Sequence, residues 1–254
     1  MSAVVVARDG RIGRVTLNRP EARNAITVEL ATGLEAAVRD LAGDTDVIVI
    51  RGAGGTFCAG GDVAEVDRLR HQGRGALATL FTAFRGALAA IAEVPVPVVA
   101  AVEGHAVAGG FELVQAVDVT VARTDARLAD IHARFGQVPG GGSTQRLSRI
   151  VGTTRALGLI LTGDTLSGAD AERWGLVYRA AAPDDFEPTL DAVVASLLRG
   201  SRTTRAASKR LIRASRDVGL DEGLDAELEA VLDHLGSSTG DDAVTAFTER
   251  ERTR

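Results

Sequence analysis

The spacing of apolar and polar residues predicts strands and helices that alternate along most of the chain. Short runs rich in β-branched residues predict strands at 3–7 and 14–18, which the turn pair Asp9-Gly10 joins as a hairpin. Continuous apolar runs predict further strands at 47–50, 98–102, 119–122 and 177–180. Apolar residues at helical spacing predict helices between Thr27 and Gly43, from about Asp62, at 75–91, 110–117, 143–151 and 154–161, and between Ser167 and Gly175. This alternation is typical of an α/β fold in which parallel strands pair and helices lie outside.

The pattern changes after Pro183, where only helical spacing remains. Helices are predicted at 186–198, 203–216, 220–235 and 242–250. We therefore expect two parts: a core of residues 1–194 that carries the ligand site, and a helical C-terminal region of residues 195–254.

Composition limits the classes of partner. The 254 residues are 45% apolar and 25% charged, and 29 Lys plus Arg against 34 Asp plus Glu give a net charge of −5. This balance argues against nucleic acid as the main partner, although a local basic patch could bind a small polyanion. The N-terminus is too interrupted by charge for a signal peptide, no apolar run approaches the length of a membrane span, and the single Cys58 excludes an internal disulfide. We expect a cytoplasmic protein with no membrane partner.

Two glycine-rich loops follow predicted strands. The first reads GGTFCAGGDV (54–63) and the second EGHAVAGGFE (103–112), and each leads into a predicted helix. Glycine lets the backbone approach a ligand closely, and a helix N-terminus offers free amides. Two amides from separate helix starts have the geometry of an oxyanion hole. From these residues alone, two ordinary tight turns are an equally good interpretation.

Glu112 is the main candidate for proton transfer. It lies in an apolar predicted helix, where an unpaired carboxylate is costly and its pKa rises. A carboxyl group with a raised pKa is suited to general acid–base chemistry. The alternative is a structural glutamate that pairs with an arginine or a backbone amide.

Five strings carry a family resemblance: NRPEARNAI (18–26), FCAGGDV (57–63), GHAVAGGFEL (104–113), PGGGSTQRL (139–147) and LTGDTLSGADAERWGLV (161–177). In order and spacing they resemble the enoyl-CoA hydratase/isomerase (crotonase) superfamily over nearly the whole chain. The resemblance implies a crotonase-like spiral of ββα turns with a helical C-terminal region. It also implies homotrimers, commonly paired into hexamers, and an acyl-CoA substrate that brings CoA with it, with no metal and no redox cofactor.

The resemblance also implies roles for individual residues. The backbone amides of Gly61 and Gly109 correspond to the oxyanion hole, Glu112 to the first of two catalytic glutamates, and the Gly140 amide to a group that positions water. The implied contacts with CoA or substrate are Arg23, Ala59, Asp62, Phe247 and Arg250. A lysine that the family often carries two residues after the loop aspartate is Ala64 here, so one CoA contact is missing or replaced.

The second catalytic glutamate of the family is absent, and His132 stands at its place. Histidine has an unperturbed pKa of about 6.5 and could deliver a proton to Cα of the substrate. It also removes a like charge beside Glu112. Alternatively, His132 only shapes the pocket. The substitution weakens the case for the isomerase reaction, which in this family uses a carboxylate at this position.

These observations predict an enzyme that hydrates a 2-enoyl-CoA to a 3-hydroxyacyl-CoA. Two alternatives stay open at this point. One is an enzyme that uses the same enolate for C–C bond hydrolysis, decarboxylation or thioester hydrolysis. The other is a non-catalytic member of the superfamily that binds acyl-CoA.

Overall fold

The computed structural model describes residues 2–237. The chain divides into two compact units between Arg199 and Gly200. The boundary expected at 194/195 falls within α8 (Phe186–Leu198), and this helix belongs to the first unit.

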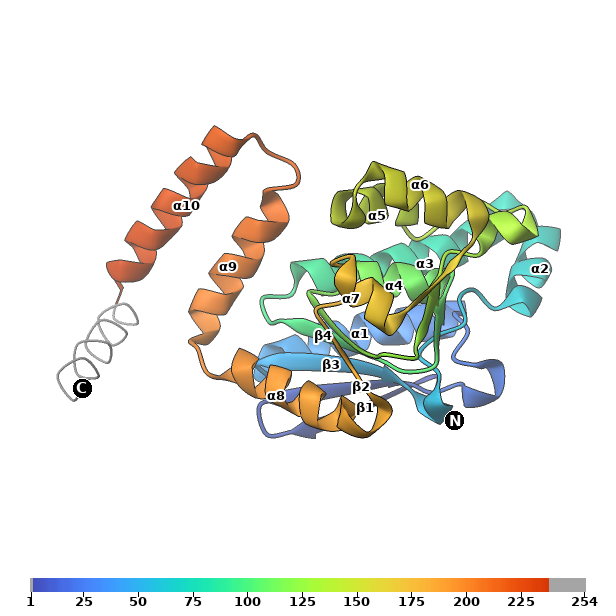
Figure 1. Ribbon diagram of the computed structural model, residues 1–254, viewed down its shortest axis with the longest axis horizontal. Coiled ribbons are helices and arrows are strands. Elements are labelled where there is room, and N and C mark those ends of the chain that lie inside the picture. The colour runs from blue at the N-terminus through green and yellow to red at the C-terminus, as the bar shows by residue number, and fades with distance from the viewer. Residues whose placement is uncertain (1, 238–254) are drawn as a thin grey trace. The chain divides into compact units, whose positions relative to one another are not determined.

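A six-stranded sheet with the order β1-β2-β3-β4-β6-β9 forms the centre of the first unit (Figure 1). β1 and β2 form the predicted antiparallel hairpin, and every other neighbouring pair in this sheet is parallel. β3 and β4 are buried along nearly their whole length, as their continuous apolar runs predict. The strands are β1 (Val4–Asp9), β2 (Ile12–Leu17), β3 (Val47–Gly52), β4 (Val98–Val102), β6 (Val119–Arg123) and β9 (Arg179–Ala181).

Helices cover both faces of this sheet, as Figure 1 shows. α1 (Val28–Asp44) and α3 (Arg74–Glu93) pack together and bury their apolar sides in the larger core cluster. α8 packs on the opposite face, where its buried side chains meet those of β3, β4 and β6. The α8 residues in this second cluster are Phe186, Leu190 and Val194. The alternation of strand and helix therefore produces the expected sheet with helices outside it.

A second sheet of three short strands was not predicted from the sequence. It consists of β5 (His105–Val107), β7 (Arg127–Ala129) and β8 (Thr165–Ser167), each only three residues long. Strands this short carry no readable period. β5 and β7 are parallel, with Val107 opposite Ala129. Their carboxyl ends therefore place the residues after 107 beside the residues after 129, which is where ligands bind in parallel sheets.

The remaining helices of the first unit follow the predicted order. Thr27 caps α1, since its side chain accepts a hydrogen bond from the Leu30 amide, and Ser167 caps α7 through the Asp170 amide. Both caps were predicted from the sequence. These helices are α2 (Val63–His71), α4 (Gly109–Ala116), α5 (Ser143–Val151), α6 (Thr153–Thr162) and α7 (Gly168–Arg173).

α3 corrects one expectation. By length and composition alone this helix could cross a membrane, whereas no run of that length was expected. However, Leu80, Phe84, Leu88 and Ile91 on one side of α3 are buried in the core cluster. The core helix of a soluble protein passes the same test of length and composition, and one side of α3 packs in the core in this way.

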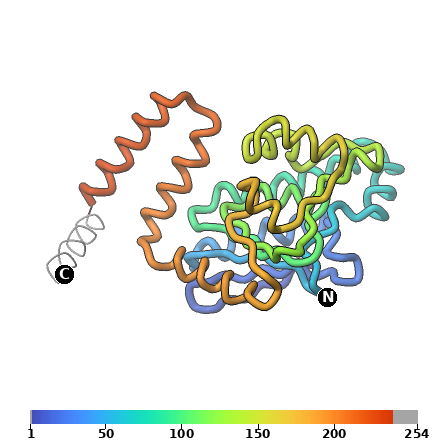
Figure 2. Tube along the Cα trace, in the orientation of Figure 1, coloured from blue at the N-terminus to red at the C-terminus, as the bar shows by residue number. Residues whose placement is uncertain are grey.

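The described part of the second unit contains two helices, α9 (Arg202–Ala214) and α10 (Leu220–Leu235), drawn in orange and red in Figure 2. They pack against each other. α10 exposes a stripe of apolar side chains at helical spacing: Leu220, Leu224, Leu228, Val231, Leu232 and Leu235. The helix predicted at 242–250, with Phe247 and Arg250, lies outside the described residues.

Two glycines in neighbouring helices give a matched test of this packing. A methyl group on the buried Gly168 of α7 would overlap the backbone carbonyl of Arg123 at the end of β6, whereas one on Gly158 of α6 meets nothing within 4 Å. Gly168→Ala should lower the free energy of unfolding by about 1–3 kcal/mol because the backbone must move. Gly158→Ala should raise it by about 0.5–1 kcal/mol because alanine favours the helix. Urea denaturation measures both, and a Gly168→Ala protein as stable as wild type would contradict the packing of α7 on β6.

Candidate active site

The two glycine-rich loops lie against each other through their backbones. The Cys58 amide donates to the His105 carbonyl at 2.9 Å, and the Val107 amide donates to the Cys58 carbonyl at 3.0 Å. A methyl group on Gly110 would overlap the same Cys58 carbonyl oxygen. Glycine at this position is therefore what lets the start of α4 come this close to the first loop.

The contact brings Gly61 and Gly109 together. A methyl group on Gly60, whose φ is +91°, would lie 3.1 Å from the Gly109 nitrogen and 2.7 Å from the Ala108 Cβ. One on Gly109 would lie 3.6 Å from the Gly61 nitrogen. Neither the Gly61 nor the Gly109 amide donates a hydrogen bond to any residue in the range 2–237. Two unpaired N–H groups from separate loops are thus adjacent.

Local geometry explains why the Gly61 amide stays unpaired. The Ile26 amide donates to the Gly60 carbonyl at 2.7 Å, and the Asp62 amide donates to the Ile26 carbonyl at 2.9 Å. These two bonds tie down the residues on either side of Gly61. Ile26 and Gly61 thus form a parallel β-bridge, in which the N–H of Gly61 points away from Ile26.

Ala108 fixes the second turn in a strained conformation. Its φ of 49° and ψ of −119° lie in a region that residues with a side chain rarely adopt. Such a residue costs about 1–3 kcal/mol and persists only where its surroundings hold it. Here the Ala108 amide donates to the Ala129 carbonyl at 3.0 Å and the Ala108 carbonyl accepts from the Glu112 amide at 3.0 Å. The strain lies immediately before the unpaired Gly109 amide.

Three residues expected to contact CoA or substrate lie at the first loop. The Ala59 amide donates to the Arg23 carbonyl at 3.0 Å, so the 18–26 segment is attached to this loop. The Asp62 side chain caps α2 through the Glu65 amide and forms an ion pair with Arg19 at 2.9 Å. Partial burial opposes ionisation of Asp62, but the amide and the guanidinium together hold its pKa below the usual value. Asp62 thus has a structural role in addition to any contact with substrate.

Glu112 is buried and points at the loop before α5. Its Oε1 accepts hydrogen bonds from the Gly141 amide at 2.7 Å and the Ser143 amide at 3.1 Å. Its Oε2 accepts none from the described residues. Only 2% of the residue is exposed, and burial raises its pKa despite the two amides. The amide pairing that was considered as a structural alternative is present, yet it occupies only one of the two oxygens.

His132 is held by a neighbour that the sequence analysis missed. Its Nδ1 lies 2.6 Å from Oδ1 of Asp130, a residue with no exposed surface, while Oδ2 of Asp130 is buried without a partner in the described part of the chain. Burial alone would lower the pKa of His132, but the bond to Asp130 and its charge raise it. Asp130 also raises the pKa of Glu112, and so restores some of the like charge that the loss of the second glutamate removed.

The spacing Asp-x-His directly after β7 was the signal for this pair. Because β7 has only three residues and no readable period, the two side chains could not be assigned to the same side from the sequence. β5 leads to Gly109 and β7 leads to Asp130 and His132, so the two parallel strands deliver these groups to one place.

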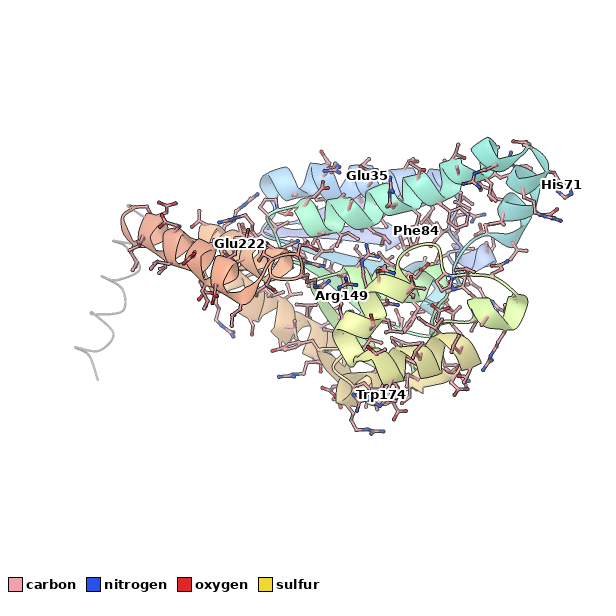
Figure 3. All side chains as sticks on the ribbon, turned by 90° about the horizontal axis from the view of Figure 1, so that it is seen from above. Glu35, His71, Phe84, Arg149, Trp174 and Glu222 are labelled. Atoms are coloured by element: carbon pink, nitrogen blue, oxygen red, sulfur yellow. The ribbon has the colours of Figure 1, made fainter. Side chains whose placement is uncertain are left out.

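Gly140 is next in the chain to Gly141, whose amide donates to Glu112. A methyl group on Gly140 would lie 2.5 Å from Cε1 of Phe81, and one on Gly141 would lie 2.5 Å from Cε1 of Phe84 and 2.7 Å from Oε2 of Glu112. Figure 3 shows Phe84 on α3, on the side towards α5. Within the described residues the Gly140 amide donates no hydrogen bond. Glycines here let the loop pass between α3 and Glu112.

Cys58 is excluded as a nucleophile. Its thiol is fully buried, and burial raises its pKa to about 12. It packs as a small apolar side chain in the core cluster.

Comparison with known proteins shows the family to which the chain belongs. The family model for enoyl-CoA hydratase/isomerase matches residues 7–254. A probable enoyl-CoA hydratase (echA8) of Mycobacterium bovis is 35% identical over 252 residues, which cover 97% of this chain and 95% of that protein. An enoyl-CoA hydratase structure from Polaromonas sp. JS666 superposes with a TM-score of 0.94 at 27% identity, with 97% of each chain covered. A Thermobifida fusca structure in complex with acetoacetyl-CoA has a TM-score of 0.83 at 28% identity and covers 92% of this chain and 95% of that one. The chain therefore belongs to the enoyl-CoA hydratase/isomerase (crotonase) superfamily.

Proposed function

We propose that this protein is an enoyl-CoA hydratase, which adds water across the C2–C3 double bond of a 2-enoyl-CoA to give a 3-hydroxyacyl-CoA. The observation that carries the proposal is the pair of unpaired amides, Gly61 and Gly109, in the same site as the buried Glu112 and His132. The names of the relatives support the same reaction.

In this mechanism the amides of Gly61 and Gly109 hold the thioester carbonyl oxygen. When water attacks C3, the π electrons move toward C2 and negative charge develops on that oxygen. Donors that already point at the oxygen stabilise this charge at little reorganisation cost. Removing one such donor typically costs about 3 kcal/mol of transition-state stabilisation.

Glu112 acts as the general base. Oε1 is occupied by the Gly141 and Ser143 amides, which fixes the carboxylate and leaves Oε2 to accept a proton from the attacking water. The Gly140 amide orients that water. The O–H bond of water breaks as its oxygen bonds to C3, and the proton stays on Glu112.

His132 acts as the acid that protonates C2. In the imidazolium form, Nδ1–H donates to Asp130 and Nε2–H is left for the substrate. Transfer of the Nε2 proton to C2 collapses the enolate and completes the product. Glu112 then returns its proton to His132 through solvent, so the site is reset without any other reagent. The addition involves no net oxidation or reduction, so the reaction needs no redox cofactor.

CoA enters as part of the substrate. Arg23, Ala59 and Asp62 at the first loop are proposed to line its path, with Phe247 and Arg250 added from outside the described residues. A guanidinium is suited to binding phosphate. The Thermobifida fusca relative in complex with acetoacetyl-CoA supports an acyl-CoA ligand.

The hydratase reaction is tested with crotonyl-CoA by following the loss of the conjugated-thioester absorbance. Wild type should hydrate crotonyl-CoA. Glu112→Gln should lower kcat by about 10²–10⁴-fold, because the amide keeps the hydrogen bonds to Gly141 and Ser143 but cannot take a proton. Circular dichroism confirms that the variant folds. No hydration at any chain length, with turnover of a β-diketone or a malonyl-type thioester instead, would contradict the proposal.

Asp130→Asn should change the pH dependence of the rate. The Asp130 carboxylate stabilises the imidazolium, so its loss lowers the pKa of His132 and the active, protonated form disappears at lower pH. The alkaline limb of the kcat profile should therefore move to lower pH. Asp125→Asn removes an equal charge from an exposed turn, where Asp125 pairs with Arg123, and should leave the limb in place. An unchanged alkaline limb in Asp130→Asn would show that His132 is not the acid.

We further propose that the chain forms homotrimers, which can pair into hexamers. The exposed apolar stripe of α10 supports this, since exposed apolar stripes of this kind mark interaction surfaces. Sedimentation velocity should show wild type as a trimer or hexamer, and Leu228→Lys should shift it to smaller species. Glu227→Lys, on an exposed position of the same helix, should not. A monomeric wild type would contradict the proposal.

A further inference from the structure

A groove with a volume of about 400 Å³ runs along one face of α3. Its lining combines an apolar floor with two arginines, and the residues recur at three- and four-residue spacing, so they form a single stripe of the helix. The lining residues are Arg74, Leu77, Ala78, Phe81, Thr82 and Arg85 of α3, with Gly140 as the opposite wall.

The groove adjoins the proposed catalytic site. Gly140 forms its wall, and the next residue, Gly141, donates to Oε1 of Glu112. Phe81 on the floor is 42% exposed, and Phe84, one turn further along α3, faces Gly141, whose added methyl group would also meet Oε2 of Glu112. A substrate chain that extends from the atoms on which Glu112 acts and passes Gly140 would reach this groove.

The charges in the groove are unbalanced. Arg74 and Arg85 are exposed, and neither forms an ion pair or hydrogen bond with a residue in the described part of the chain. By contrast, the arginines of the preceding helix, Arg68 and Arg70, are each paired with a carboxylate of α2. The lining contains no acidic residue. The groove thus offers two unneutralised guanidinium groups above an apolar floor.

We propose that this groove binds the distal part of the acyl chain, and that Arg74 and Arg85 select 2-enoyl-CoA substrates whose chain ends in a carboxylate. Leu77, Ala78 and Phe81 cover the methylene groups, and a guanidinium at either end of the stripe pairs with the terminal carboxylate. The inference rests on the proposed hydratase function and names the substrate class of that same site.

A CoA phosphate is the other anion that these arginines could meet, and the position of the groove favours the carboxylate. Glu112 acts at C2 and C3, and the groove wall continues directly from the loop that holds Glu112. The residues proposed to contact CoA, Arg23 and Ala59, lie instead at the first loop, beside Gly61.

Matched substrate pairs test the inference. The initial rates are measured for trans-2-octenedioyl-CoA against trans-2-octenoyl-CoA, and for the corresponding six-carbon pair, which differ only in a terminal carboxylate or methyl group. Wild type should favour the carboxylate in at least one pair. Arg74→Gln or Arg85→Gln should lower kcat/KM for the acidic substrate by about ten-fold and leave the neutral one nearly unchanged, as expected for loss of a charged hydrogen bond. Glutamine favours the helix as well as arginine does, so both variants should fold.

The controls separate the possible failures. Arg70→Gln removes an equal charge from α2 and should not change the preference. If the variants weaken the acidic and neutral substrates equally, while pantetheine thioesters without the CoA phosphates are unaffected, the arginines serve CoA and the inference is overturned. Equal rates for both members of each pair in wild type would also overturn it, although hydration itself would stand. Failure to hydrate any of the four substrates would refute the hydratase proposal as well.

Discussion

The contact between two glycine turns is the constraint on which the rest of the site depends. Gly60 and Gly110 have no side chain, and a methyl group on either would meet backbone or Cβ atoms of the opposite loop. The short strand β5 and the 18–26 segment attach to the same loop through backbone hydrogen bonds. The unpaired amides of Gly61 and Gly109 can therefore lie side by side only because the backbone is this close. Strain at Ala108 is the cost of that arrangement.

The ionisable groups beside this contact have opposite roles in proton transfer: Glu112 accepts a proton and His132 donates one. Two amides hold Glu112 in place, and its burial raises its pKa despite them, which makes it a stronger base when ionised. The Asp130 carboxylate favours the charged form of His132. Its second oxygen is buried without a partner in the described residues. The family's pair of glutamates is thus replaced by one glutamate and an aspartate–histidine pair. One carboxylate accepts a proton while the imidazolium gives one, which fits an addition reaction in which both steps occur in turn.

Much of the fold follows from patterns that the sequence displays directly. The bounds predicted for α5, α8 and α10 agree with the structure, because apolar residues at helical spacing run through each of them. The two glycine loops and the buried Glu112 could also be found, since glycine pairs before apolar helices and a lone carboxylate among apolar residues are conspicuous. The strand predicted at 177–180 begins later, at Arg179, since the preceding segment turns out of α7.

Other features depend on contacts that no local pattern encodes. The three strands of the small sheet have three residues each, and only their mutual pairing defines them. Asp130 becomes a partner of His132 because β7 ends beside β5. The groove on α3 requires knowing which arginines lack a carboxylate neighbour, and this depends on the packing of α2, α3 and the loop at Gly140. Such information is tertiary, so one sequence could not supply it.

The central claim is that the Gly61 and Gly109 amides polarise a thioester carbonyl. Isotope-edited infrared difference spectroscopy of bound butyryl-CoA, labelled with ¹³C at C1, measures this directly, because a saturated thioester binds without being hydrated. Two strong hydrogen bonds weaken the C=O bond, so the labelled stretch should move to a lower frequency than in water. A stretch at or above its frequency in water would show that the two amides do not hold the carbonyl oxygen.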